Sequence, residues 1–275
     1  DDDQAIYGWA GADVQRFQEE PAKDIVLPQS YRVPQAVQQI ADQILNRIPD
    51  DRRIKKQWAP RPETGNVDHI TSIEDAPLHQ SDWLILARTN DKLIKLKSIL
   101  RDMPIYFEIK GRKSYKTRLY TAIKNYTRWT KGDKLSLSEC KDLFEYLELD
   151  QELKEERMYD LQEFGYKTTD EWYEVFKSDP EECLYIREML RSGEKLDNPA
   201  RVKLSTIHAA KGGEATNVLI ILDNTKKIRE AIDKSEDKQD EEHRVWYVGV
   251  TRTKQNLYIM TAKQEDRGYD IESIT

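Results

Sequence analysis

The segment DEEHRVWYVGVTRTKQNLYIM, residues Asp240–Met260, contains the pattern that decides the fold. Its acidic start suits the N-terminus of a helix, where the helix dipole favours negative charge. Val245, Val248 and Val250 give this helix an apolar side, and the apolar residues of Leu257–Met260 predict a buried strand. A packed helix joined to a packed strand by a few residues is typical of an α/β protein.

Arg252 lies in the short passage between the predicted helix and the predicted strand. An arginine held between two packed elements has few rotamers available, and its planar guanidinium is then preset for bidentate contact with a phosphate. The alternative is an ordinary surface arginine, and this segment alone does not decide between the two.

The composition limits the class of protein. The chain has 275 residues, 35% of them charged and 38% hydrophobic, and a net charge of −7. No apolar run approaches the roughly 20 residues of a membrane span. Cys140 and Cys183 lack the spacing of a metal or redox motif, so we expect no metal site and a reducing, cytoplasmic setting. The opening DDDQ predicts no signal peptide and suggests a piece of a longer protein.

The charge is unevenly distributed along the chain. Ten Lys/Arg and three acidic residues in Arg88–Arg118 give +7, whereas fourteen basic and twenty acidic residues in Lys116–Ala200 give −6. The basic stretch includes KGRKSYKTR, Lys110–Arg118, in which basic residues surround Tyr115. This pattern predicts a track for a nucleic-acid backbone, with a solvated loop as the alternative.

Strands and helices alternate over most of the sequence. We expect strands at Asp24–Leu27, Val67–Ile70, Asp82–Ala87, Ile105–Ile109, Val202–Thr206 and Val218–Leu222. Helices are expected after Pro34 and from Asn90. Tyr31 and Arg32 then fall at a strand-to-helix junction, where α/β proteins gather ligands. The loop HAAKGGEAT, His208–Thr216, lies between two such strands and is dense in polar residues and glycine.

Residues 116–198 carry helical spacing only, at Tyr120–Trp129, Leu135–Leu147, Gln151–Phe164, Asp170–Phe176 and Pro180–Leu190. We interpret them as an α-helical insertion into the sheet. Near the start of the chain, Tyr7 and Trp9 stand among glycine and alanine, which predicts rings open to nucleobase stacking; packing of both rings on the core is the alternative.

One absence matters as much as these patterns. The sequence contains no GxxxxGK followed by Ser or Thr, the phosphate loop of ATPases. We therefore read Asp223, after the apolar strand VLIIL, as a strand-end residue rather than a magnesium ligand. The chain by itself is expected not to hydrolyse ATP.

Four segments resemble, in order and spacing, motifs of the superfamily 1 DNA helicases of the UvrD/Rep/PcrA type. DDDQAIYGWAGA is similar to their third motif and LPQSYR to the fourth; VKLSTIHAAKGGEATNVLIILD is similar to the fifth and DEEHRVWYVGVTRTKQNLYIM to the sixth. LARTN and IKGRKSY also match sequences that this family carries between those motifs. The resemblance implies a RecA-like parallel sheet with flanking helices, interrupted by an all-α insertion. It divides the chain into the tail of a first RecA-like domain (1–23), a second RecA-like domain (24–115 and 200–275) and a reduced accessory subdomain (116–199).

The resemblance also implies roles for single residues, all around ATP and DNA. Arg252 would be the arginine finger, and Arg32 and Gln4 would reach or sense the γ-phosphate. Tyr31 would pack on the adenine, and Glu214 would accept a hydrogen bond from the ribose. The residues implied in DNA binding are Tyr7, Trp9, Arg88, Lys110, Arg112, Lys113, Thr206 and His208. The ligands of Mg²⁺ are expected in a preceding RecA-like domain, which is also the implied partner.

The sequence departs from the family pattern at three positions. Ala10 stands where the family usually has arginine, which removes one DNA contact; Gly213 replaces a leucine and Thr253 an alanine. The insertion is also short, so the accessory domain's regulatory behaviour does not carry over.

We therefore predict the C-terminal portion of an ATP-dependent DNA helicase that moves 3′-to-5′ on single-stranded DNA and acts at single-strand/duplex junctions, in DNA repair or replication, as a monomer away from membranes. Two alternatives stay open. One is a DNA-binding or partner-binding module without catalysis, and the other is a translocase that does not unwind.

Overall fold

The computed structural model describes residues 1–11, 16, 19, 25, 27–147, 149, 153, 157–167, 169–262 and 267–271, without the side chains of Trp9 and Leu161. The chain forms two compact units: unit 1 comprises Asp1–Ile99 and Arg201–Thr275, and unit 2 comprises Leu100–Ala200. Each unit has a hydrophobic core of its own. The domain limits expected from the motifs stay a prediction.

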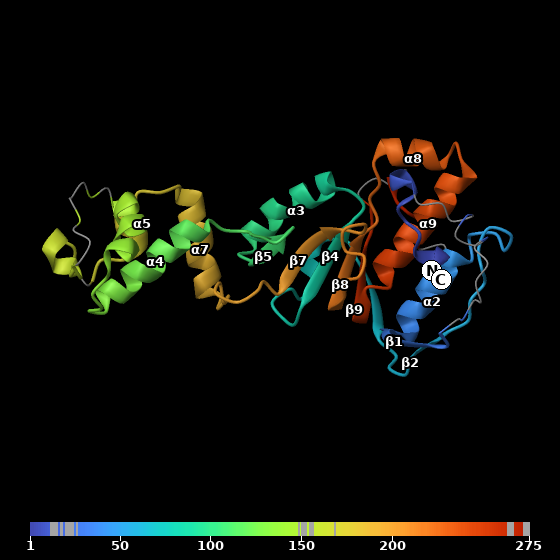
Figure 1. Cartoon of the computed structure of the whole chain (residues 1–275), viewed down its shortest axis with the longest axis horizontal. Helices are drawn as coiled ribbons and strands as arrows, with labels where there is room; N and C mark the ends of the chain where they lie inside the picture. Colours follow the sequence, from blue (N-terminus) through green and yellow to red (C-terminus); the bar gives the residue numbers. More distant parts are fainter. Residues whose placement is uncertain are drawn as a thin grey trace. The chain divides into compact units, whose positions relative to one another are not determined.

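A parallel sheet forms the centre of unit 1 (Figure 1). Its strands lie in the order β3 (Asn66–Ile70), β9 (Thr253–Met260), β8 (Ala215–Ile221), β4 (Trp83–Ala87) and β7 (Val202–Thr206), and every pairing among them is parallel. All five residues of β4 are buried, as the apolar run WLILA requires of a strand with neighbours on both edges. The expected α/β fold class with a RecA-like parallel sheet is confirmed.

Two helices cover one side of this sheet, α2 (Gln35–Leu45) and α9 (Glu236–Val250), and they lie together in Figure 1. Helix α9 begins four residues before the predicted acidic start, because the Ser235 side chain caps it by accepting from the Lys238 N–H. Gly249 in its last turn allows close packing, since a Cβ there would lie 2.7 Å from Ile220 Cδ1. Further helices with described bounds in unit 1 are η1 (Asp2–Gln4), η2 (Gly8–Ala10), η3 (Ile73–Asp75), α8 (Lys226–Ile232) and most of α3 (Asn90–Asp102).

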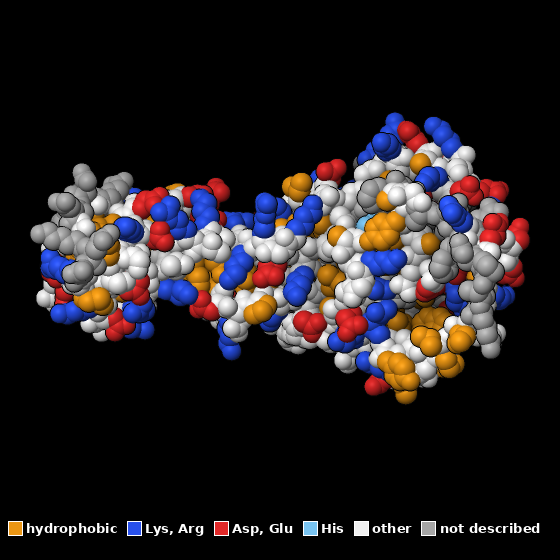
Figure 2. Space-filling model, in the orientation of Figure 1, with side chains coloured by type: hydrophobic (Ala, Val, Ile, Leu, Met, Phe, Trp, Pro, Cys, Tyr) orange, Lys and Arg blue, Asp and Glu red, His pale blue; other side chains and the backbone are white. Residues whose placement is uncertain are grey.

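A second, two-stranded parallel sheet pairs β1 (Gln29–Pro34) with β2 (Ala59–Arg61). It corrects one expectation. Tyr31 and Arg32 lie within β1 rather than after a strand, because Gln29 pairs with Ala59 and Pro34 with Arg61. The expected strand at 24–27 falls partly on residues 24 and 26, outside the described part. Hydrophobic side chains gather on the surface over β1 and β2 in Figure 2. Tyr31 in β1 is 87% exposed, and Ile25 and Leu27, which precede β1 in the chain, are 77% and 78% exposed.

Unit 2 combines a short hairpin with helices. Strands β5 (Phe107–Ile109) and β6 (Arg112–Lys113) are antiparallel and joined by Lys110 and Gly111, which both have positive φ (51° and 72°), as in a two-residue hairpin turn. The helices are α4 (Thr117–Thr130), α5 (Leu137–Leu147), η4 (Leu161–Phe164), α6 (Trp172–Val175) and α7 (Pro180–Arg191). The helix expected at Gln151–Phe164 is wrong over residues 157–160, which are not helical because Tyr159 forms a β-bridge with Leu135; only η4 at its end is helical, and several residues before 157 lie outside the described part.

No helix within the described ranges has the length and apolar character needed to cross a membrane.

Candidate nucleotide and nucleic-acid sites

The chain places Arg252 where a helix ends and a strand begins. Helix α9 stops at Val250, Thr251 caps it, and β9 starts at Thr253. The Arg252 Nε–H donates to the Val248 carbonyl at 2.8 Å, and Nη2 donates to Thr251 Oγ1 at 3.2 Å. Nη1 reaches the Gly213 carbonyl at 3.5 Å, which is at the limit of a hydrogen bond. The side chain is thus held in one rotamer, and the residue is only 1% exposed.

The charge of Arg252 is poorly compensated. Within the described residues it makes no ion pair, and burial together with the nearby Arg32 guanidinium lowers the pKa of Arg252 to about 10. Arg32 pairs with Glu214 at 3.6 Å between Nη1 and Oε2, but its buried Nε has no hydrogen-bond partner there. Glu214 is shared with Lys254, whose Nζ lies 3.1 Å from Oε1. Two cations, Arg32 and Lys254, therefore share one carboxylate, and the Arg252 guanidinium lies nearby without an ion pair of its own among the described residues; this excess of positive charge favours binding of an additional anion.

Two other residues expected at ATP have different surroundings. Tyr31 is 87% exposed, so its ring is free to receive a flat ligand. The Gln4 side chain donates to Asp1 Oδ2 at 2.7 Å, and its backbone carbonyl accepts from Lys211 Nζ at 2.9 Å. Among the described contacts, none joins Gln4 to Arg32 or Arg252. The structure thus brings Arg32, Glu214 and Arg252 together. Gln4 instead forms its hydrogen bonds with Asp1 and Lys211.

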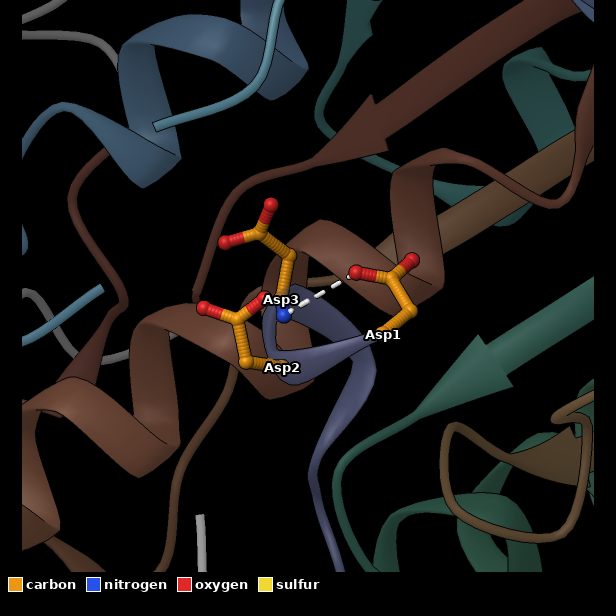
Figure 3. Close-up of side chains that lie close together, drawn as sticks. All are labelled: Asp1, Asp2 and Asp3. Atoms are coloured by element: carbon orange, nitrogen blue, oxygen red, sulfur yellow. Dashed lines mark hydrogen bonds between the residues drawn. The ribbon is translucent and has the colours of Figure 1, made fainter. Parts of the chain in front are cut away.

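Asp1, Asp2 and Asp3 form the one group of three acidic or metal-ligating side chains found close together in the described part (Figure 3). Lys56 Nζ contacts all three, at 3.0 Å from Asp1 and 2.9 Å from Asp3, and Arg53 Nε lies 3.6 Å from Asp3. Burial alone would raise the pKa of Asp2, but the Lys56 ammonium and the Ile54 N–H outweigh it, and the pKa lies below its ordinary value. These carboxylates already have cationic partners, so the cluster fits Mg²⁺ poorly.

A pocket of about 490 Å³ opens in unit 1 at the carboxyl ends of β4 and β7. Ala87 and Thr206 are paired across these strands, so Arg88 and His208 follow two neighbouring strand ends. Ligands of parallel α/β sheets gather at such ends. The pocket is lined by Arg88, Thr89, Asn90, Thr206, His208, Ile228, Ala231, Ile232, Lys238, Glu241 and Glu242. Three residues expected to bind DNA, Arg88, Thr206 and His208, therefore share one pocket.

His208 is a neutral, restrained member of this pocket. Burial and the nearby Arg88 cation lower its pKa below the ordinary value, so the imidazole is uncharged at neutral pH. Tyr7 packs beside it: the ring centroids are 6.1 Å apart, and the Tyr7 hydroxyl donates to the His208 carbonyl at 2.9 Å. Lys211 Nζ lies 5.2 Å from the centre of the Tyr7 ring. The Trp9 side chain lies outside the described part.

Several pocket residues were missed from the sequence. Thr89 Oγ1 is buried and has no hydrogen-bond partner among the described residues, which leaves it available to a ligand. Glu242 pairs with Arg88, and Glu241 pairs with Lys238 at 2.6 Å. Thr89 is the second residue after the buried strand β4, so its position in the sequence could have indicated the site, whereas Glu241 and Glu242 look like ordinary acids near a helix start.

The basic track expected at Lys110–Arg118 is smaller than predicted. Lys110 and Arg112 are exposed on the β5–β6 hairpin. Lys113 Nζ instead donates to the Tyr115 hydroxyl at 3.0 Å and to the Leu196 carbonyl at 3.1 Å, and Tyr115 is only 5% exposed. Arg118 pairs with Asp142 and Glu145, each at 2.7 Å. Tyr115 is therefore a core residue of unit 2, and packing against its helices removes the expected aromatic from the surface.

The model of the UvrD-like helicase C-terminal domain family matches residues 112–264. This match covers more than half of the chain. The chain belongs to the UvrD-like helicase C-terminal domain family. No curated protein matches the chain.

The matched range contains most of unit 2 and three strands of unit 1, β7, β8 and β9. It therefore includes Thr206, His208, Glu214 and Arg252. Gln4, Tyr7, Tyr31, Arg32 and Arg88 lie before it and depend on the motif resemblance and on the contacts described above.

Proposed function

We propose that this chain is the C-terminal portion of an ATP-dependent DNA helicase that moves 3′-to-5′ along single-stranded DNA. ATP would bind between the Arg32–Arg252 face and a preceding RecA-like domain that carries the phosphate loop. Closure and reopening of that cleft would step the strand along, as ligand-driven domain closure does in other enzymes.

The observation that carries this proposal is the pair of cations at Arg32 and Arg252. Arg252 is buried without an ion pair in the described part, and Arg32 keeps an unpartnered buried Nε beside a shared carboxylate. Two poorly compensated guanidinium groups suit a triphosphate, whose charge increases on the transferred phosphoryl group in the transition state. Arg252 would exchange its weak 3.5 Å contact with Gly213 for a phosphate oxygen.

ATP and Mg²⁺ are the cofactors in this proposal. When bound, Mg-ATP supplies the phosphoryl group that is transferred to water. The exposed Tyr31 ring would stack on the adenine, and Glu214 would accept from the ribose after giving up one of its two cations. Gln4 would reach the γ-phosphate only after its side-chain amide breaks the hydrogen bond with Asp1. Gln4 is therefore a candidate for a residue that changes its hydrogen-bond partner when nucleotide binds.

Single-stranded DNA would bind along the pocket at the ends of β4 and β7. Arg88 and Thr89 offer donors, the neutral His208 ring offers a surface for a base, and Ile228 and Ile232 form an apolar wall. The Tyr7 hydroxyl holds the His208 backbone through the hydrogen bond to its carbonyl, and Thr206 at the end of β7 lines the same pocket. Lys110 and Arg112, both exposed on the hairpin of unit 2, are separate candidates for contact with a nucleic-acid backbone.

The test uses a protein in which this chain follows a RecA-like domain with an intact phosphate loop. Single-stranded DNA is expected to stimulate ATP hydrolysis, and a duplex with a 3′ tail is expected to unwind faster than one with a 5′ tail. Stimulated hydrolysis without unwinding would indicate a translocase. Tight DNA binding with no nucleotide hydrolysis would overturn the proposal in favour of a binding module.

A further inference from the structure

Glu242 is a buried carboxylate that lines the pocket and pairs with another pocket residue, Arg88. Its side chain is 4% exposed and lies on α9. Oε1 and Oε2 accept from the Arg88 Nε–H at 3.1 and 3.0 Å. Oε1 also accepts from the Trp246 indole N–H at 2.8 Å, one helical turn away. A buried carboxylate with these partners is fixed in place.

The contact has a specific effect on Arg88. Glu242 accepts hydrogen bonds only from the Nε of Arg88. The two terminal nitrogens of Arg88 have no hydrogen-bond partner among the described residues. The Arg88 side chain is 18% exposed and lines the pocket. A guanidinium held by Nε keeps its terminal donors directed and free, so that less side-chain entropy is lost when a ligand oxygen binds.

Helix α9 connects this arrangement to the other arginine site. Glu242 lies eight residues before Val250, the last residue of the helix, about 12 Å along it at 1.5 Å per residue, and Arg252 follows two residues later. Arg252 is bonded to the Val248 carbonyl in the last turn of the same helix. Trp246 lies between them, fully buried, and stacks on Tyr269 at 5.0 Å between ring centres. One packed helix therefore holds the arginines of both sites.

We propose that Glu242 is a positioning residue that orients the Arg88 guanidinium toward a phosphate of single-stranded DNA, with the Trp246 N–H fixing the carboxylate. This inference rests on the proposed function, because it takes the pocket to be a DNA contact. An ion pair that serves only stability is the competing explanation, and buried ion pairs are often close to neutral in stability.

The experiment measures binding of a fluorescein-labelled oligothymidylate to this chain by fluorescence anisotropy at several salt concentrations. The salt slope is the steepness with which the logarithm of the binding constant falls against the logarithm of the salt concentration. Arg88→Ala is expected to weaken binding about tenfold and to lower this slope by about one. Glu242→Gln should weaken it several-fold and lower the slope in the same way, and the double variant should bind like Arg88→Ala alone. A purely structural role would not change the slope.

A matched control is available in unit 2. Glu182 is also buried, with a side chain 6% exposed, and it pairs with Arg101 at 2.8 Å. Glu182→Gln removes the same kind of buried charge and is expected to change thermal stability without changing the salt slope. Trp246→Phe, which removes only the indole N–H donor and part of the ring, is the second variant if Glu242→Gln does not fold.

The outcomes separate the two proposals. If Glu242→Gln or Trp246→Phe weakens binding equally with and without Arg88, or leaves binding unchanged while Arg88→Ala weakens it, Glu242 does not act through Arg88 and the inference is wrong. If Arg88→Ala itself leaves affinity and slope unchanged, the pocket is not the DNA contact, and the proposed DNA-binding role of Arg88 fails first.

Discussion

Arg252 donates its Nε–H to the Val248 carbonyl at 2.8 Å, so the guanidinium is bonded to the last turn of α9. Nη1 and Nη2 remain for the weaker contacts with Gly213 and Thr251. Only a side chain with several separate donors can keep such an attachment and still reach a ligand. This geometry distinguishes arginine from lysine at the position.

The first prediction follows from that difference. In a protein completed by a RecA-like domain, Arg252→Lys is expected to lose DNA-stimulated ATP hydrolysis almost as fully as Arg252→Ala, by about 10³-fold. The lysine retains the charge but has no second nitrogen to hold Val248. Steady-state hydrolysis rates measure this, with DNA binding as the control that should change little. A lysine variant with near-normal turnover would show that charge alone matters.

Glu214 gives a second prediction, because it can either bind the ribose or merely neutralise Arg32. Its pKa is held below the ordinary value by Lys254 first, with a further contribution from Arg32, so it is ionised at neutral pH. Glu214→Gln should strengthen binding of inorganic tripolyphosphate, since two cations are released, and weaken binding of ATP if the ribose role is correct. Calorimetric titration of both ligands checks it, and parallel changes for both would contradict the ribose contact.

The pocket at the ends of β4 and β7 gives a third prediction. His208→Ala is expected to weaken single-stranded DNA binding about tenfold by removing a base-stacking surface, with little change in salt slope because the ring is neutral. His69, exposed on β3 and outside the pocket, supplies the control variant His69→Ala. Anisotropy measures both variants. Equal losses at the two positions would argue against a specific stack.

His243 predicts how stability depends on pH. Burial, reinforced by Arg47 and Arg244, lowers the pKa of His243 to about 4, and Nδ1 lies 2.7 Å from the Tyr269 hydroxyl. The unfolded chain therefore binds more protons here between about pH 6.5 and 4, so the contribution is complete above pH 6.5 and decreases as the pH falls. This contribution of His243 to the free energy of unfolding amounts to at most about 3 kcal/mol.

Urea unfolding at pH 7.5 and pH 4 of the parent chain and of His243→Gln measures this effect. The difference in unfolding free energy between the two proteins should shrink toward pH 4, where the parent has lost its contribution. A difference that is the same at both pH values would mean that His243 does not titrate as described.

Gly249 predicts a packing effect in the core between α9 and β8. Gly249→Ala would put a Cβ 2.7 Å from Ile220 Cδ1 and 3.4 Å from Ile207 Cδ1. Overpacking of this kind costs about 1–3 kcal/mol, more than the helix gains from alanine. Adding Ile220→Val removes the clashing methyl and should recover part of the loss, although Ile220→Val alone is destabilising. Thermal unfolding of the four proteins tests this, and additive losses would contradict it.

Much of unit 1 could be predicted from sequence because its strands are local patterns. The runs at β4 and β8 are apolar over four or five successive residues, as expected of a strand buried in a parallel sheet, and β7 alternates buried and exposed residues at its start. The helix-only spacing after Lys116 likewise predicted α4, α5 and α7. Boundaries were less accurate: β1 lies later than expected, and the Ser235 cap lengthens α9, because strand pairing and capping depend on neighbours that a pattern does not identify.

The sequence by itself determined the order of the elements, the family motifs and the rigid placement of Arg252 between a helix and a strand. Only the tertiary structure decided which charged side chains have partners within the protein and which are available to a ligand. Lys113 and Tyr115 are used inside unit 2, whereas Glu242, 154 residues from Arg88 along the chain, is placed against it by packing of α9. Local composition fixes helices and strands, but the partner of a charged side chain depends on contacts distant in sequence, which form only when the cores pack.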